Sequence, residues 1–337
     1  MSKGNIRLER VDRKGQVHFY LAKDLRIGKA KSKVTKYIGT SEPSTSELEQ
    51  FIRASRFDIE MRAIKKKAEV SARRYISYPF DPSEGLEVIG SIERFRFLYL
   101  ACQELLSVDE VALYEEQLEH QYVGGTTAIE GNTLTLRQTH LLLKEGMVPD
   151  KPLREINEVQ NFRLVKRLRD SHKGKITIEV IKRFHSLVMS NIDMGSGELR
   201  RVDDIVIVGR EGSLCPSVMI EDELHEAIDE YYRSMDEGMS PFIAAVRFHH
   251  RFECVHPFTD GNGRVGREVF NLMLIMNKYP RMVFLGRDRE RYLHALSLGD
   301  DGDEKGMIKE FAALLISQRT DTAESKLRSL TDIERSK

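Results

Sequence analysis

The sequence predicts a mainly α-helical fold, preceded by a small β-sheet and one further helix. From Glu93 onward, apolar residues recur with helical spacing almost throughout the chain. The first 38 residues instead alternate polar and apolar positions in short runs, as strands do. Hydrophobic residues make up 40% and charged residues 31% of the 337 positions, which is typical of an ordinary soluble protein with a core.

The predicted sheet consists of three short runs at the start of the chain. They are Ile6–Val11, Val17–Ala22 and Lys33–Ile38, and Arg13-Lys14-Gly15 forms a hairpin turn between the first two. In the first 38 residues Lys and Arg outnumber Asp and Glu by 11 to 3. A basic sheet can contact nucleic acid, but we favour a solvated charged face, so nucleic acid is not an expected partner.

A long helix and a linker follow the sheet. Ser44-Thr45-Ser46-Glu47 has the spacing of a capping box, which opens a charged helix that extends to about Arg74. Two prolines and a glycine predict that residues 75–91 are a loop or linker. We therefore expect a basic β segment over residues 1–42 and a helix with its linker over residues 43–92.

The rest of the chain carries one helical pattern after another, interrupted once. Amphipathic helices are predicted at Arg94–Leu106, Val108–Tyr122, Leu136–Glu145, Pro152–Arg169, Thr177–Asn191, Ile220–Met235, Pro241–Val255, Gly263–Lys278 and Lys305–Gln318. Asp203–Gly209, with the sequence DDIVIVG, predicts a strand that forms a hairpin with the residues after Gly212. The polar tail over residues 319–337 is expected to be loose.

Composition and charge argue against several classes of protein. Lys+Arg and Asp+Glu both number 53, so the net charge directs the chain toward neither nucleic acid nor a membrane surface. The charged start lacks the apolar region of a secretory leader, and the longest apolar runs are too short to span a bilayer. Cys102, Cys215 and Cys254 are isolated thiols without metal-type spacing. We therefore expect a cytoplasmic protein without a membrane partner.

The residues that carry chemistry lie between Val255 and Arg267, with the sequence VHPFTDGNGRVGR. Pro257 and the Asp260-Gly261-Asn262-Gly263 run end the preceding helix, and an apolar helical pattern resumes at Val265. A glycine turn that leads directly into a helix N-terminus offers backbone N–H groups and a partial positive charge to a phosphate.

Four side chains in this stretch suit phosphate and metal chemistry. Arg264 and Arg267 lie three residues apart in the first helical turn, where both guanidinium groups can bind phosphate oxygens from one side. Asp260 offers the hard carboxylate oxygen that Mg²⁺ prefers. His256 is a candidate general base directly before the turn. A base, an acid, a glycine turn and two arginines within twelve positions favour a catalytic site over a structural helix end.

These residues match the motif HPFx(D/E)GNGRxxR at every defined position, and the chain thereby resembles the Fic family. Gly197-Glu198-Leu199-Arg200 and the DDIVIVG run resemble the substrate-clamping flap of that family. Asp288-Arg289-Glu290-Arg291-Tyr292 and Gly302-Asp303 resemble its closing segment.

The resemblance extends over about two thirds of the chain, from Phe95 to Gln318. It implies a Fic domain over residues 93–318, with a helical catalytic core at about residues 176–318 and a small β-hairpin flap. The usual activity of the family is transfer of AMP from Mg-ATP to Ser, Thr or Tyr hydroxyls of proteins. ATP and Mg²⁺ are therefore the implied cofactors, and a protein hydroxyl is the implied acceptor.

The resemblance also implies a role for each residue of the motif. His256 removes the proton from the attacking hydroxyl, and Asp260 holds Mg²⁺ on the α and β phosphates. The backbone N–H groups of the glycine turn form an anion hole with Asn262, and the two arginines hold the β and γ phosphates. A family branch that transfers phosphate has Lys at the position of Gly263, so this glycine favours AMP transfer. Phe258 is an anchor in the core. The implied ATP-binding residues are Asp260, Gly261, Asn262, Gly263, Arg264, Val265, Gly266, Arg267, Val208, Gly209 and Tyr292.

A second motif points to self-inhibition. The sequence TTAIEGN, from Thr126 onward, resembles the inhibitory motif (S/T)xxxE(G/N) of the subclass whose inhibitory helix precedes the core. Thr126 and Glu130 share one face of a helix, so the glutamate can pair with Arg267 and occupy the seat of the γ-phosphate. The alternative is an exposed helix end with Gly131 as its C-cap. The resemblance favours inhibition by Thr126, Glu130 and Gly131.

The inhibitory helix is expected over residues 107–132. Gly124-Gly125 directly precedes the motif, so we expect this helix to be short or mobile and the inhibition to be leaky. The same glutamate can position a water molecule for removal of AMP, as in some relatives.

A binding protein is the alternative to an enzyme. In that interpretation the basic N-terminal segment contacts nucleic acid or a partner, and the core only senses nucleotide. His249, His250 and His256 could suggest a metal cluster, but adjacent helix residues face different sides, which favours core or surface histidines. Tyr292 can stack near the adenine or lie in the core. The sequence names no target protein, and it leaves self-modification and a homodimer open.

Overall fold

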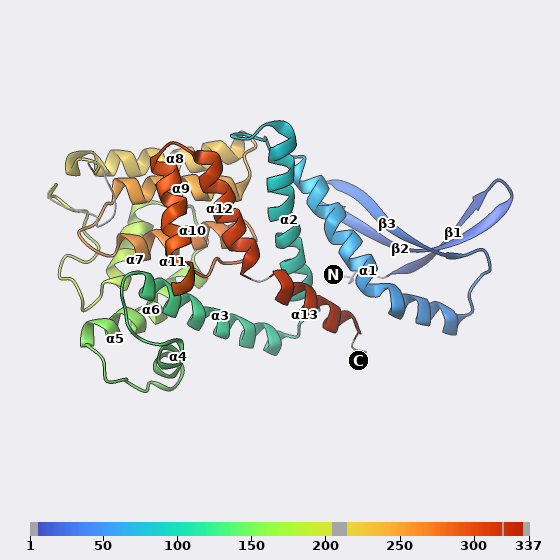
Figure 1. Cartoon of the computed structure of the whole chain (residues 1–337), viewed down its shortest axis with the longest axis horizontal. Helices are drawn as coiled ribbons and strands as arrows, with labels where there is room; N and C mark the ends of the chain where they lie inside the picture. Colours follow the sequence, from blue (N-terminus) through green and yellow to red (C-terminus); the bar gives the residue numbers. More distant parts are fainter. Residues whose placement is uncertain (1–5, 204–213, 319, 333–337) are drawn as a thin grey trace. The chain divides into compact units, whose positions relative to one another are not determined.

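The computed structural model describes residues 6–203, 214–318 and 320–332. The chain divides into two compact units, one formed by Met1–Val111 with Arg319–Lys337 and the other by Ala112–Gln318. The first unit contains the small sheet, drawn in blue in Figure 1, and the second is helical. The predicted fold class, a mainly helical chain that begins with a small sheet and a helix, is confirmed.

Three strands form an antiparallel sheet in the order β1-β2-β3. β1 (Arg7–Arg13) pairs with β2 (Gln16–Ile27), which pairs with β3 (Ala30–Gly39). The predicted hairpin turn is present, because Lys14 and Gly15 have φ values of 55° and 83°, as a tight two-residue turn requires. β2 is longer than predicted because its pattern of buried residues continues past the predicted end.

The long helix that follows the sheet begins where the sequence predicts. α1 spans Thr45–Ala72 and starts with a capping box. The Ser44 hydroxyl accepts the Glu47 N–H at 3.3 Å, and the Glu47 carboxylate accepts the Ser44 N–H at 2.8 Å. This reciprocal pair satisfies two backbone donors at the helix end.

The predicted linker over residues 75–91 is wrong in its second half, because α2 spans Pro82–Leu105. The Asp81 carboxylate caps this helix and accepts two backbone N–H groups at 3.0 Å. Proline occupies the first helical position, where its missing N–H costs nothing and its fixed φ suits the helix. Pro82 therefore marks a helix start and not the loop that the prolines predicted.

The tail is also not loose as predicted, because α13 (Thr320–Asp332) packs within the first unit. Leu327 is fully buried in a cluster with Ile64, Leu98 and Cys102. Since α2 contributes Leu98 and Cys102 to this cluster, the boundary between the compact units falls near residue 111 and not at residue 92.

The second unit is built from helices α3 to α12. They are α3 (Val108–Ile129), α4 (Leu136–Glu145), α5 (Leu153–Gln160), α6 (Phe162–Ser171), α7 (Ile178–Val188), α8 (Ile220–Asp236), α9 (Pro241–Val255), α10 (Asn262–Met276), α11 (Arg289–Asp300) and α12 (Glu304–Ser317). The short 3₁₀ turns Ser217–Met219 and Gly286–Asp288 precede α8 and α11.

Several of these helices differ from the prediction. The pattern over Pro152–Arg169 forms α5 and α6, because the chain turns at Asn161, whose amide donates to the carbonyls of Val188 and Ser190 at 2.9 and 2.8 Å. α11 was not predicted, since few of its side chains are buried and its apolar periodicity is correspondingly weak.

α10 is the central helix of this unit and packs against α7 and α9. Val265, Val269 and Phe270 are each 0% exposed, and burial extends around the whole helix. A helix that is buried on all sides belongs to a core. The loop between α9 and α10 is therefore held at both ends by well-packed helices.

The predicted strand over Asp203–Gly209 falls mostly on residues 204–213, which lie outside the described residues. Val208 and Gly209, both predicted to bind ATP, lie there too, so their role stays a prediction. Among the described residues, no helix is long and apolar enough to cross a membrane.

Candidate active site

The loop from His256 to Gly261 is a fixed turn between α9 and α10. His256 ends α9 in the left-handed conformation, with φ 49°, and Gly261 precedes α10 with φ 81°. Phe258 is 0% exposed, as its predicted anchoring role requires. The Asn262 side chain accepts the Phe258 N–H at 2.8 Å and donates to the Phe258 carbonyl at 2.7 Å. In this structure the Asn262 side chain therefore closes the loop.

A histidine from α7 supports the same loop. The His185 ring stacks on the Phe258 ring, with the two centroids 3.8 Å apart. Its Nδ1 accepts the Gly197 N–H at 2.7 Å, so Nε2 carries the proton and donates to the Asp260 carbonyl at 3.0 Å. Burial lowers the pKa of His185, which keeps this ring neutral. His185 could not be predicted from the sequence, because no local spacing connects it to the loop.

The N-terminus of α10 is a candidate anion site. The N–H groups of Asn262, Gly263 and Arg264 belong to the first helical turn and have no acceptor within the helix, and the helix dipole adds partial positive charge. The Val265 N–H is already bonded to the Gly261 carbonyl at 3.0 Å. Val265 and Gly266, both predicted to bind ATP, are buried in α10, and their contact with ATP stays a prediction.

Arg264 holds the carboxylate of the loop. It is 1% exposed and forms ion pairs with Glu158 at 2.9 Å and with Asp260 at 3.0 Å. Arg154 on α5 pairs with the other oxygen of Asp260. Arg154 and Glu158 were missed from the sequence, because they lie about a hundred positions away from the motif.

Asp260 is ionised and accessible enough to serve as a metal ligand. Burial raises the pKa of its carboxyl, but Arg264, the Gly261 N–H and Arg154 together outweigh this and lower the pKa. Its side chain is 42% exposed, and that of Arg154 is 56% exposed. A carboxylate of this kind suits Mg²⁺, provided that Arg154 moves aside.

Arg267 is bound by the segment at the end of α3. Its guanidinium, 1% exposed, pairs with Glu130 Oε1 at 2.7 Å and donates to the Thr126 hydroxyl at 2.8 Å and carbonyl at 2.9 Å. The predicted pairing of Glu130 with Arg267 is thus present in the structure, and Thr126 adds two contacts that were not predicted.

The Glu130 carboxylate lies over the start of α10. A Cβ atom added to Gly263 would come under 3.0 Å from Glu130 Oε1 and from the Arg267 guanidinium. Burial raises the pKa of Glu130, but the charge and hydrogen bond of Arg267 outweigh this and lower the pKa. A carboxylate therefore occupies the place at the helix N-terminus that suits an anionic ligand.

The end of α3 is neither short nor loosely held, contrary to the expectation from Gly124-Gly125. α3 continues through both glycines to Ile129. A Cβ atom on Gly125 would come under 3.0 Å from the Phe284 carbonyl oxygen, so the glycine permits close packing of α3. Gly131 then turns the chain with φ 95°, and whether inhibition is leaky stays untested.

Buried ion pairs fasten α3 to the rest of the site. Arg169 pairs with Glu119 on α3 and, at 2.8 Å, with Glu268 on α10. Arg281 pairs with the same Glu119 at 2.5 Å. These side chains are at most 8% exposed, so breaking one pair would leave a buried charge, which is costly.

Tyr292 lies in the core, which is one of the two positions that the sequence left open for it. It is 2% exposed and its ring lies 5.6 Å from the Arg267 guanidinium. Its hydroxyl contacts Nε2 of His249 at 2.9 Å. His249 is 0% exposed, and burial, followed by the charge of Arg267, lowers its pKa to about 3. His249 is therefore a neutral core residue and not a ligand beside His256.

Part of the chain is similar in sequence to known Fic proteins. The model of the Fic/DOC family matches residues 175–274. Protein adenylyltransferase fic-1 of Caenorhabditis briggsae is 35% identical over 198 residues, which cover 57% of this chain and 38% of that protein. Protein adenylyltransferase Fic of Drosophila willistoni is 30% identical over 230 residues, which cover 66% and 45%. The chain thus spans about two fifths of the length of these curated relatives.

Solved structures support the fold. A Fic domain containing signaling protein from Bacteroides thetaiotaomicron VPI-5482 aligns with a TM-score of 0.62 and 22% identity, over 70% of this chain and 98% of that one. Fic-1 (aa134–508) from C. elegans aligns with a TM-score of 0.56 and 24% identity, over 83% and 86%. The region that matches the Fic/DOC family model, residues 175–274, contains the whole loop from His256 to Arg267.

Proposed function

We propose that this chain is a protein adenylyltransferase, which transfers AMP from ATP to a Ser, Thr or Tyr hydroxyl of a protein and is held inactive by Glu130. Two observations support the activity. Relatives that are 30–35% identical are named protein adenylyltransferases. The loop before α10 combines an imidazole, a carboxylate and a helix N-terminus, which suit attack on a phosphate.

In the proposed reaction the acceptor hydroxyl oxygen attacks the α-phosphorus of ATP. The bond between the α-phosphorus and the bridging oxygen breaks, pyrophosphate leaves, and the hydroxyl proton passes to the imidazole of His256. Arg200 donates to the His256 carbonyl at 2.8 Å and so holds the backbone of the base in place. The first N–H groups of α10 stabilise the charge that develops on the α-phosphate oxygens.

Asp260 is the residue that would hold Mg²⁺, together with oxygens of the nucleotide. Bound Mg²⁺ would neutralise phosphate charge and orient the triphosphate. The structure fits this role, since the Asp260 carboxylate is ionised and partly exposed at the mouth of the helix N-terminus. Arg154, now paired with Asp260, would then be free to contact a phosphate.

The observation that supports the proposed inhibition is the 2.7 Å ion pair between Glu130 and Arg267. Arg267 is the arginine that the resemblance assigns to the γ-phosphate. With Glu130 in that seat, the triphosphate meets a carboxylate at close range and lacks its cation. ATP then lies in a pose that does not present the α-phosphorus to the acceptor, so the enzyme is inhibited.

The experiment is to compare wild type and Glu130→Gly for AMP transfer. Both are incubated with ATP and a cell extract, and intact-protein and peptide mass spectrometry measure the gain of one AMP. We expect Glu130→Gly to exceed wild type by on the order of 10–100-fold, the value of one charge-assisted contact. Glu116→Gln, a change at a partly exposed position on the same helix, is the matched control and should leave the rate unchanged.

Two results would contradict the proposal. If neither protein transfers AMP although both bind ATP, the chain is not an adenylyltransferase. If wild type is as active as Glu130→Gly, the chain is an adenylyltransferase that Glu130 does not inhibit. The double variant with Arg267→Ala should lose the gain, because the γ-phosphate needs the freed arginine.

A further inference from the structure

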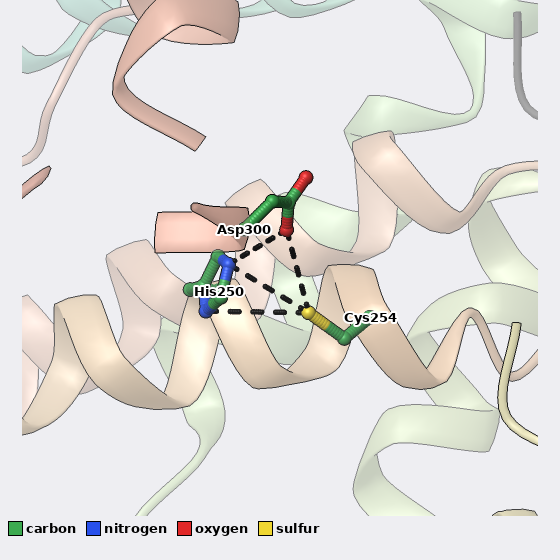
Figure 2. Close-up of side chains that lie close together, drawn as sticks. All are labelled: His250, Cys254 and Asp300. Atoms are coloured by element: carbon green, nitrogen blue, oxygen red, sulfur yellow. Dashed lines mark hydrogen bonds and ion pairs between the residues drawn. The ribbon is translucent and has the colours of Figure 1, made fainter. Parts of the chain in front are cut away.

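A second group of ligand-type side chains lies on the other side of α9 from the core. His250 and Cys254 are one helical turn apart on α9, and Asp300 is the last residue of α11. Figure 2 shows the three side chains pointing toward one another. Their ligand atoms all lie within 4.8 Å of one another. None of them takes part in the adenylyltransferase site proposed above.

The distances suit one tetrahedral metal ion. Zinc–ligand lengths of about 2.0–2.3 Å place a thiolate about 3.6 Å from a nitrogen or oxygen ligand, and a nitrogen about 3.4 Å from an oxygen. Cys254 Sγ lies 3.7 Å from His250 Nε2 and 3.8 Å from Asp300 Oδ1. Nε2 and Oδ1 are 2.9 Å apart as a hydrogen-bonded pair, and a metal that replaces this proton would need them to separate by about half an ångström.

The cluster borders an open pocket of about 390 Å³, so an ion and a fourth ligand can enter. Arg247 and Arg251 also line this pocket, but acids balance their charges. Arg247 pairs with Glu230 at 3.1 Å, and Arg251 pairs with Glu230 at 2.8 Å. Arg247 also pairs with Glu304, and Arg251 with Glu223, each at 3.0 Å. A thiolate and a carboxylate beside a dication therefore add no net charge to the pocket.

The position of the imidazole is fixed by the neighbouring helix. A Cβ atom added to Gly299 would lie 2.6 Å from His250 Nε2. The ring therefore rests directly on the backbone of α11, with Nε2 toward Asp300. A larger residue at this position would push the ring away from the other two ligands.

We propose that His250, Cys254 and Asp300 bind one Zn²⁺ ion, with the fourth position open to water or a small ligand from the pocket. Imidazole, thiolate and carboxylate are ligands that zinc takes readily, whereas Mg²⁺ prefers oxygen ligands alone. The ion joins α9 to α11. α9 ends at His256, and α11 carries Tyr292 beneath Arg267, so the metal clamps two helices that support the active site.

The test uses the untagged full-length protein, treated with a chelator and titrated with Co²⁺ as a probe for Zn²⁺. We expect one equivalent to bind and to give the intense near-ultraviolet absorption of a thiolate bound to cobalt, which carboxylate sites such as Asp260 do not give. Zn²⁺ should displace this signal and raise the melting temperature. Cys254→Ser should abolish the absorption, and His250→Ala and Asp300→Asn should each weaken binding at least about tenfold.

Cys215→Ser is the control, since it removes a partly exposed thiol outside the cluster and should leave the cobalt spectrum unchanged. Gly299→Ala should also weaken binding, because it displaces the imidazole. The proposal is overturned if wild type gives no thiolate absorption with micromolar Co²⁺. It is equally overturned if the absorption persists in Cys254→Ser, because the thiolate ligand would then be another cysteine.

Discussion

Replacing Glu130 by glycine is expected to let the site distinguish ATP from ADP. In the wild-type structure the Arg267 guanidinium is bonded to Glu130 and Thr126 and is 1% exposed. The γ-phosphate then gains little from this arginine, so ATP and ADP should bind with similar affinity. Without the carboxylate, Arg267 can bind the γ-phosphate that only ATP carries.

The size of the preference for ATP follows from the contact that Arg267 would make with the γ-phosphate in place of Glu130. A hydrogen bond between charged groups contributes about 1.5–3 kcal/mol to binding or stability. The Glu130 side chain is 30% exposed, so solvent screens part of the contact and favours the lower half of this range. A gain of about 1.5–2 kcal/mol corresponds to roughly a 10–30-fold preference for ATP.

Calorimetric titration with ATP and with ADP, in the presence of Mg²⁺, measures the two affinities. A His256→Ala background prevents turnover during the titration. Glu130→Gln is a second informative variant, because it keeps the shape of the side chain and removes its charge, and it should give an intermediate preference. If the ratio of the ATP and ADP affinities is the same in Glu130→Gly as in wild type, then Glu130 does not occupy the γ-phosphate seat.

Four further predictions test other parts of the site. His256→Ala should lower AMP transfer by about 10²–10⁴-fold with ATP affinity retained, as transfer assays and titrations can measure. Asp260→Asn should remove the Mg²⁺ dependence of ATP binding, and unchanged dependence would place the metal elsewhere. Because the folded pKa of Glu130 is lowered, its pairing stabilises the fold above the ordinary glutamate pKa of about 4.3. The melting-temperature difference between wild type and Glu130→Gln should therefore shrink as the pH falls below that value. Gly125→Ala should cost about 1–3 kcal/mol of stability, measured by urea unfolding, because its methyl group meets the Phe284 carbonyl.

Local sequence patterns predicted the part of the site whose residues are neighbours in the sequence. The turn before α10 is readable because Gly261 and the residues around it specify a break and a restart within a few positions. The capping box at Ser44 is readable for the same reason. The pairing of Glu130 with Arg267 spans 137 positions and came from family resemblance, since no local rule joins two such residues.

The contacts that the sequence analysis missed are those that depend on packing between distant segments. Arg154 reaches Asp260 across 106 positions, and His185 reaches its carbonyl across 75. Asn262 is a residue whose role the sequence leaves ambiguous, because an amide can bind an anion or close a loop. Only the structure shows that its side chain bonds Phe258. Pro82 was predicted to interrupt helical structure, but it begins α2 directly after the Asp81 cap, because proline starts helices as well as ending them.

The central claim is that this chain transfers AMP when Glu130 no longer blocks the site. The most direct measurement incubates Glu130→Gly with ATP that is labelled either at the α-phosphorus or at the γ-phosphorus, and follows the label into protein. We predict incorporation from the α position alone, and none when His256 is also replaced by alanine. Incorporation from the γ position would mean phosphate transfer, and no incorporation of either label by a folded, ATP-binding variant would contradict the account.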